Sequence, residues 1–282
     1  ISPVVLFQYP TPRQLEAHLA EISAELPEEL AGVEKVTSFL EDFRASAHAR
    51  FEKSTEDAPS DGMTVEERMD ADVEELDLGR LPPLSSLAAE PRIVLLTGCT
   101  GWLGSFLLAE LLTQTTATIY CLVRAESAFA GMRRLEAGVA QLGLSELPLH
   151  RCMVFTGSLE QERLGLSPGD YKLLAHSVDA IWHNGARVDH VLNYRQLKAS
   201  NVNGTVEILR LAADTKLKPV HFVSTYASLF CSPAAGKGLM LTEESPLPDS
   251  TAMGSSADAS LVNGYSQSKW VAERMVLKAS RL

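Results

Sequence analysis

The sequence predicts an α/β fold, in which helices cover both faces of a doubly wound parallel sheet. From residue 92 onward, short apolar runs alternate with longer amphipathic stretches, as strands alternate with helices in such folds. A glycine-rich turn follows the first apolar run, and a Tyr-x-x-x-Lys pattern lies near the end of the sequence. Together these features predict a sheet that binds its ligand at the carboxyl ends of the strands.

The alternation also predicts the bounds of the individual elements. Strands are expected at 93–97, 118–123, 152–156, 180–183 and 220–224. Helices are expected at 105–113, 127–142, 168–177 and 194–216, and a further helix carries the Tyr-x-x-x-Lys pattern. Because connections between parallel strands are right-handed, these helices are expected to divide between the two faces of one sheet.

The residues that precede the sheet have a different character. Residues 1–20 predict a loop and a short helix, and residues 21–68 predict an acidic helical linker. Within that linker, the polar stretch 54–64 is expected to be mobile. The main domain is expected to span 69–282, and its first residues, 69–90, contain a proline pair and are expected to lie extended on the sheet domain.

The charge of the chain is concentrated before the sheet. The 282 residues carry a formal net charge of −11, and residues 21–80 contain 18 acidic and 6 basic side chains. The other residues contain 18 acidic and 19 basic side chains. The predicted ligand-binding part is therefore nearly neutral, and the basic surface that nucleic acid binding requires is missing.

The composition also bears on the location of the protein. No run of about 18 uncharged apolar residues is present, so no membrane span is expected. The apolar N-terminus lacks a basic start and is interrupted by Pro3 and Pro10, which does not fit a signal peptide. The four cysteines are far apart and lack the spacing of metal ligands, which predicts free thiols in a reducing cytoplasm and no metal site.

The glycine turn TGCTGWLG, residues 97–104, has the features of a dinucleotide site. Gly98 permits a sharp turn, Gly101 lets a pyrophosphate approach the backbone, and Gly104 lets the following helix pack close to the strand. The free N–H groups at the start of that helix attract phosphate. Strand, turn and helix therefore predict a Rossmann-type cofactor site, and the alternative is a glycine-rich corner without a ligand.

The basic residues after the second strand predict which dinucleotide is bound. An acidic residue at this place would accept a hydrogen bond from a ribose 2′-hydroxyl, but the sequence has Arg124. Arg133 and Arg134 follow on the next helix and add guanidinium groups that suit a 2′-phosphate. We therefore expect NADP(H) rather than NAD(H), unless these arginines are ordinary solvated charges.

The Tyr-x-x-x-Lys pattern predicts a proton donor. Tyr265 and Lys269 share one helix face, and an ammonium near the phenol is expected to lower its pKa. Ser224 or Thr225, at the end of the fifth strand, is placed to hydrogen-bond a substrate oxygen. The stretch 231–263, rich in small and polar residues, is expected to be either a gating loop or disordered.

These motifs together resemble an extended or atypical short-chain dehydrogenase/reductase. The stretches IYCLVRAES, HNGARVDHVLNYRQLKASNVNGT, PVHFVSTYASL and NGYSQSKWVAERMV narrow the likeness to a thioester reductase domain. Such domains end nonribosomal peptide synthetases and some polyketide synthases, and they occur in carboxylic acid reductases and aminoadipate reductases. The likeness runs from about residue 69 to 282. Residues 1–20 resemble the last helix of the carrier protein that precedes such a domain.

The resemblance implies a role for each matching residue. Thr225, Tyr265 and Lys269 match the catalytic Ser/Thr–Tyr–Lys triad, and Asn201 matches a position that orders the site. The family holds the 2′-phosphate with residues that match Arg124 and Arg134. The remaining expected cofactor contacts are Thr97, Gly98, Thr100, Gly101, Trp102, Leu103, Gly104, Ser158, Leu159, Asn184, Gly185, Ala186 and Lys269. Ser158 departs from the family, which has aspartate there, so adenine recognition is expected to rely on Leu159 and the backbone.

The implied activity is NADPH-dependent reductive release of an acyl or peptidyl thioester from a carrier protein, as an aldehyde or, after a second round, an alcohol. The upstream carrier domain of the same chain is the implied partner. Family members continue beyond the Tyr–Lys helix into a substrate lobe. We therefore expect a sheet truncated before that lobe, which folds but is inactive alone. The alternatives are a reductase or epimerase of nucleotide sugars or other free small molecules, and a non-catalytic NADP(H)-binding regulator or scaffold.

Overall fold

A computed structural model describes residues 62–83, 90–144, 146–231 and 263–282. The carrier-like segment 1–20, most of the linker 21–68 and most of the expected gating loop 231–263 lie outside the described residues. No helix of the described part is long and apolar enough to cross a membrane.

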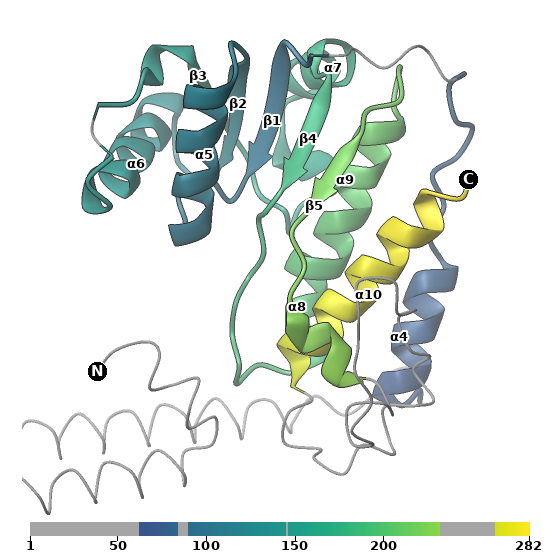
Figure 1. Cartoon of the computed structure of the whole chain (residues 1–282). Coiled ribbons are helices and arrows are strands. Elements are labelled where there is room, and N and C mark those ends of the chain that lie inside the picture. The colour runs from purple at the N-terminus through teal and green to yellow at the C-terminus, as the bar shows by residue number, and fades with distance from the viewer. Residues whose placement is uncertain (1–61, 84–89, 145, 232–262) are drawn as a thin grey trace, which may run out of the picture.

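The described part is built on a sheet of five parallel strands, as predicted. The strands are β1 (Ile93–Thr97), β2 (Thr118–Val123), β3 (Cys152–Thr156), β4 (Ala180–His183) and β5 (Val220–Phe222), in the order β3-β2-β1-β4-β5. All strand arrows point the same way in Figure 1. The chain leaves β1 toward one edge and returns to β4 on the other side, which confirms a doubly wound, Rossmann-type sheet.

Alternate residues of β1 face two separate apolar cores. Leu95 packs into a core with residues of α7 (Pro168–Ser177) and α9 (Gly204–Ala213). Val94 and Leu96 pack into a second core with residues of α5 (Trp102–Gln114) and α6 (Ala128–Gln141). Both faces of the sheet are therefore covered, which explains why its central strands are almost wholly apolar.

The helix expected at 194–216 is broken into three pieces. It consists of α8 (Tyr194–Lys198), a π-helical turn (Ala199–Asn203) and α9. The Thr205 hydroxyl donates to the Asn201 carbonyl at 2.7 Å, one of the side-chain bonds that accompany the wider turn. After Ala213, Thr215 has a positive φ of 64°, so the chain leaves the helix earlier than expected.

Strand β5 is shorter than the expected 220–224. The Val223 amide still donates to the His183 carbonyl, but the Val223 carbonyl accepts from the Lys269 ammonium at 2.7 Å. A side chain thus takes the place of the next strand partner. Short 3-10 turns complete the described part at Leu149–Arg151, Glu162–Gly165 and Tyr226–Cys231.

The expectation of an extended chain at 69–90 is wrong for its first residues. Helix α4 spans Val65–Glu74, and Thr64 and Glu67 form a capping box at its start. The helix packs against α10 (Gly264–Ala279), the helix with the Tyr-x-x-x-Lys pattern, as Figure 1 shows. Met69 and Val73 enter this contact and are fully or nearly buried, so the helix forms because it has an apolar surface to cover.

A buried carboxylate fixes α4 to the sheet domain. Asp72 is 3% exposed and accepts hydrogen bonds from Tyr194 Oη at 2.5 Å and Lys198 Nζ at 2.7 Å, both on α8. Arg68 donates to the same carboxylate from within α4. Lys278 of α10 donates to the Val73 and Glu74 carbonyls at the end of α4.

We expect Asp72→Ala to lower the free energy of unfolding by about 2–4 kcal/mol, because the substitution leaves the buried Tyr194 phenol and the partly buried Lys198 ammonium without their acceptor. Asp72→Asn keeps the shape and one acceptor oxygen, so its loss should be smaller. Urea unfolding of the two variants and the unchanged protein measures the difference. Equal stability of Asp72→Ala and the unchanged protein would contradict this account of α4.

Candidate active site

A cleft of about 560 Å³ opens at the carboxyl ends of the strands. It is the place at which an open α/β sheet binds ligands. All the residues that the sequence predicts for the cofactor or the reaction, except Arg133, line this one cleft: Thr97, Gly98, Thr100, Gly101, Trp102, Leu103, Gly104, Arg124, Arg134, Ser158, Leu159, Asn184, Gly185, Ala186, Thr225, Tyr265 and Lys269. The fold thus brings together segments that lie far apart in the sequence.

The glycine turn has the geometry that a pyrophosphate needs. Gly98 has a φ of 71°, and a Cβ at this residue would lie 2.8 Å from the Asn184 side chain. A Cβ at Gly104 would collide with the Gly98 carbonyl. Gly101 is different, because a Cβ there would meet only the Gly98 carbonyl oxygen, at 3.4 Å. Two glycines therefore serve the turn itself, whereas Gly101 leaves open space at the start of α5, where a phosphate group fits.

A buried chain of hydrogen bonds ties the glycine turn to β4. Thr97 Oγ1 accepts from the Gly185 amide at 2.8 Å and lies 2.8 Å from His183 Nδ1. His183 Nε2 lies 3.1 Å from Thr205 Oγ1, which donates its own proton to the Asn201 carbonyl. His183 must therefore donate from Nε2, and in the neutral ring Nδ1 accepts from the Thr97 hydroxyl. Burial, and secondarily the charge of Lys269, lowers the pKa of His183 to about 3.

The adenosine end of the cleft contains two of the three predicted arginines. Arg124 and Arg134 line it, and the Arg134 guanidinium donates to the Arg124 carbonyl. Arg133 is turned outward and pairs with Glu136 at 3.6 Å. The structure thus separates two arginines that the sequence treats alike.

The loop after β3 brings Ser158 and Leu159 to the cleft. The Ser158 amide donates to the Leu164 carbonyl, and Arg163 and Leu164 both have left-handed φ values, of 50° and 59°. Consecutive left-handed residues other than glycine are strained. The Glu207 carboxylate of α9 accepts from the Arg163 amide at 2.7 Å and so offsets part of this strain. Sequence reasoning missed Glu207, since an acid within a helix gives no signal of this contact.

Helix α10 places Lys269 in a buried position. The side chain is 3% exposed, its Nζ donates to the Val223 carbonyl at 2.7 Å, and it lies 3.9 Å from the centre of the Phe222 ring. Burial lowers the pKa of Lys269 to about 7, although the nearby Glu273 carboxylate favours the charged form. An amine that changes charge near neutral pH inside a cleft is a common feature of catalytic sites.

The expected lowering of the Tyr265 pKa is wrong for this structure. Burial raises the pKa of the Tyr265 phenol. The His190 ring contacts the Tyr265 ring edge-on, with 5.5 Å between the ring centres. The phenol is consequently protonated at neutral pH, which is the state that a proton donor requires.

Two hydroxyls stand at the end of β5, and their hydrogen bonds differ. Ser224 Oγ donates to Glu273 Oε2 at 2.5 Å, whereas Thr225 Oγ1 accepts from the Ala227 amide at 3.3 Å. The Ser224 hydroxyl therefore donates its hydrogen bond to a protein group rather than to a ligand. The Thr225 oxygen acts as an acceptor in its bond, so its proton is available to a ligand in the cleft.

The side chain of Asn201 joins three parts of the site. Its Oδ1 accepts from the Arg187 amide, and its Nδ2 donates to the Arg187 carbonyl and to Ser268 Oγ. Ser268 in turn donates to the Tyr265 carbonyl at 2.8 Å. The π-helical turn thus connects the loop after β4 to the helix with Tyr265 and Lys269.

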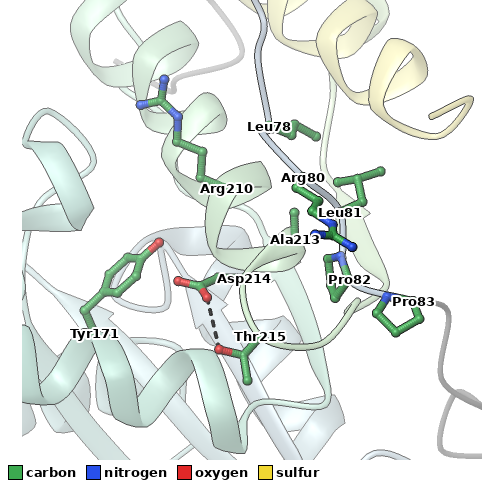
Figure 2. Close-up of a pocket in the computed structure, with 10 residues that line it drawn as sticks. All are labelled: Leu78, Arg80, Leu81, Pro82, Pro83, Tyr171, Arg210, Ala213, Asp214 and Thr215. Atoms are coloured by element: carbon green, nitrogen blue, oxygen red, sulfur yellow. Dashed lines mark hydrogen bonds between the residues drawn. The ribbon is translucent and has the colours of Figure 1, made fainter.

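A second cavity, of about 710 Å³, lies apart from the cleft. Figure 2 shows Tyr171, Asp214 and Thr215 on one side of it and the segment with Pro82 and Pro83 on the other. The predicted cofactor and triad residues are not part of its lining. The predicted cofactor and reactive groups therefore belong to the cleft at the strand ends.

Comparison with known proteins identifies the family. The model of an NAD-binding family described as "Male sterility protein" matches residues 96–282. The chain belongs to this family. The match runs from the end of β1 through the other four strands, the cleft and α10, and it confirms the resemblance that the motifs indicate.

The relatives of this chain include a synthase, a carboxylic acid reductase and an R domain. A linear gramicidin synthase of Brevibacillus parabrevis is 47% identical over 186 residues, which are 66% of this chain and 4% of that protein. A carboxylic acid reductase of Segniliparus rugosus is 37% identical over 72% of this chain and 17% of its own length. The terminal R domain of the myxalamid PKS-NRPS pathway is 41% identical, with a TM-score of 0.68, over 77% of this chain and 54% of that one. The chain thus spans only part of the proteins that it matches.

The different surroundings of two glycines predict different stabilities for their alanine variants. Gly98→Ala forces a left-handed residue into contact with Asn184 and should cost more than about 2 kcal/mol of unfolding free energy. Gly101→Ala meets open space and should change stability by less than about 0.5 kcal/mol. Thermal and urea unfolding compare the two, and equal losses would show that the turn is not built as described.

Buried Lys269 predicts a pH dependence of stability. Its pKa is about 7 in the folded chain and 10.5 in its ordinary state, so between these pH values the unfolded chain binds a proton that the folded chain does not. Stability contributed by this site therefore rises with pH across that window. Relative to Lys269→Met, the unchanged protein should gain stability between pH 7 and pH 9 in urea unfolding. A constant difference between the two proteins would contradict a buried, depressed amine.

Proposed function

We propose that this chain is the cofactor-binding and catalytic core of an NADPH-dependent thioester reductase. The observation that supports this most is the meeting of the glycine turn, Arg124 and the trio Thr225, Tyr265 and Lys269 in one cleft. The similarity to R domains and to a carboxylic acid reductase points to the same chemistry. The proposed reaction is the reductive release of an acyl or peptidyl thioester as an aldehyde.

The cleft fits the proposed cofactor along its length. The open space at Gly101 and the amides at the start of α5 would receive the pyrophosphate. Arg124 and Arg134 offer guanidinium groups to a 2′-phosphate, and Leu159 offers an apolar contact to adenine. Lys269, at the other end, would hold the nicotinamide ribose. Bound NADPH would supply the hydride that reduces the thioester carbonyl, leaving a free thiol after the aldehyde forms.

Two side chains would act on the carbonyl oxygen, and Lys269 would act through one of them. Tyr265 would donate a hydrogen bond to this oxygen and then its proton, which its raised pKa keeps in place at neutral pH. Thr225 would donate a second hydrogen bond and so stabilise the charge that develops there. The ammonium of Lys269 would favour the phenolate that Tyr265 becomes after it gives up its proton.

The proposed substrate arrives on the phosphopantetheine arm of a carrier protein. Two features support a carrier domain as partner: residues 1–20 resemble a carrier helix, and the relatives include synthetases and a thiolation-reductase di-domain. The free, buried cysteines Cys99, Cys121 and Cys152 suit a cytoplasmic location, which we also propose.

The first functional prediction concerns the choice of cofactor. The unchanged protein should bind NADPH more tightly than NADH, and Arg124→Ala should remove most of the preference. Losing a charged hydrogen-bond partner costs roughly 1.5–3 kcal/mol, which is about tenfold or more in affinity. Arg133→Ala is the matched control, since Arg133 pairs with Glu136 outside the cleft.

Quenching of tryptophan fluorescence measures the binding, because Trp102 lines the cleft and is 72% exposed. Equal affinities for NADPH and NADH in the unchanged protein, or equal effects of the two arginine substitutions, would contradict the assignment of Arg124.

The second functional prediction concerns Tyr265 as the proton donor. In a full-length protein that contains this chain, Tyr265→Phe should lower turnover of a carrier-bound thioester by roughly 10²–10⁴-fold. NADPH affinity should change little, since the ring stays in place. Consumption of NADPH, followed by absorbance, measures the rate. Near-normal turnover of this variant would remove Tyr265 from the mechanism.

The same assay separates the proposal from its rivals. The unchanged protein is supplied with a carrier-bound thioester, a free thioester or a nucleotide sugar. The proposal predicts turnover with the thioesters and the higher rate with the carrier-bound one. Turnover of the nucleotide sugar alone would favour the free small-molecule enzyme. Tight NADPH binding without turnover of any substrate would favour the regulator or scaffold.

A further inference from the structure

Glu273 lies on the same helix as Tyr265 and Lys269 and contacts the segment that carries Thr225. It follows Lys269 by one turn of α10, so both side chains share a face. Its Oε2 accepts from Ser224 Oγ at 2.5 Å and lies 3.1 Å from Ser228 Oγ. One half-buried carboxylate thus connects α10 to both ends of the turn that follows β5.

This carboxylate determines which of the Ser224 and Thr225 hydroxyls at the end of β5 can donate a hydrogen bond to a ligand. Ser224 donates its hydroxyl hydrogen bond to Glu273, while Ser228 donates to the Thr225 carbonyl at 2.7 Å. Thr225, held between these two residues, keeps its proton for the cleft. Either hydroxyl satisfies the sequence argument for a substrate contact, so the sequence leaves the choice between them open.

We propose that Glu273 is a positioning residue, which holds the turn at 224–228 so that Thr225 rather than Ser224 presents its hydroxyl to the substrate carbonyl. This inference rests on the proposed function. Glu273 itself lies outside the lining of the cleft and acts through Ser224, Ser228 and Lys269.

The charge of Glu273 also affects the pKa of Lys269, which can be measured. Burial disfavours the Lys269 ammonium, and the Glu273 carboxylate favours it. Among the residues that the structure describes, the other titratable or charged groups near this end of the cleft are His183 of β4, Tyr265 of α10, and Arg187 and His190 of the loop after β4. His183 is held neutral, and an arginine does not change charge near neutral pH. Within the described part of the chain, Glu273 is therefore the anion that opposes loss of the Lys269 proton.

Glu273→Gln is the test, because it keeps the size and one acceptor oxygen but removes the charge. NMR of protein labelled with ¹³C and ¹⁵N in lysine follows the titration of Lys269, assigned by its absence in Lys269→Met. We expect the Lys269 midpoint to fall by about half a pH unit or more. Glu110→Gln, which removes an exposed charge from α5, is the matched control and should leave the midpoint in place.

Kinetics test the positioning role in a full-length protein that contains this chain. For Glu273→Gln we expect kcat to fall about tenfold with little change in KM for NADPH, and the alkaline limb of the pH–rate profile to move to lower pH. A loss of thermal stability with an unchanged Lys269 midpoint and an unchanged pH profile would overturn the proposal, since it would show a purely structural link.

Two controls keep the outcomes distinct. If Glu273→Gln does not fold, Glu273→Asp replaces it: the charge is kept but the carboxylate is drawn back from Ser224. The proposal then predicts lower kcat with a Lys269 midpoint near that of the unchanged protein, and unchanged kcat would overturn it. Absence of thioester reduction by the unchanged full-length protein would contradict the proposed function, whereas the NMR result would still decide the effect of Glu273 on Lys269.

Discussion

The cleft depends on the hydrogen-bonded chain that runs through His183. This chain links Thr97, the last residue of β1, to the Gly185 amide after β4. It also reaches Thr205 of α9 and Asn201 of the π-helical turn. Every donor in the chain has an acceptor, so the buried polar groups add rigidity at little cost in stability. The glycine turn and the loop after β4, which form facing parts of the cleft, are thereby held in one relative position.

The same network extends to the helix that carries the reactive groups. Asn201 bonds Ser268, and Ser268 bonds the carbonyl of Tyr265. Helix α4 also supports α10 through an apolar contact, and Asp72 anchors α4 to α8. The position of Tyr265 and Lys269 is consequently set by contacts with several elements distant in sequence. This is the preorganisation that proton transfer requires.

The sequence predicts the sheet well because local patterns decide it. Four of the five strands have the predicted bounds, since apolar runs between turn residues leave little choice in a sheet covered on both faces. The residues of the cleft are likewise predictable, because strand ends and a glycine turn converge in this topology. The π-helical turn at Ala199–Asn203, the helix α4 and the roles of Glu207 and Glu273 are not predictable in this way. Each depends on a tertiary partner that the local sequence does not reveal.

Transfer of a labelled hydride to the thioester carbonyl can be followed in the product. A full-length protein that contains this chain is mixed with an acylated carrier protein and NADPH that carries deuterium at C4 of the nicotinamide on the transferred side. We expect an aldehyde product with one deuterium on its carbonyl carbon, together with a free carrier thiol. Mass spectrometry of the trapped aldehyde detects the deuterium. Release of unreduced acid, or an aldehyde without deuterium, would contradict reduction of the thioester in this cleft.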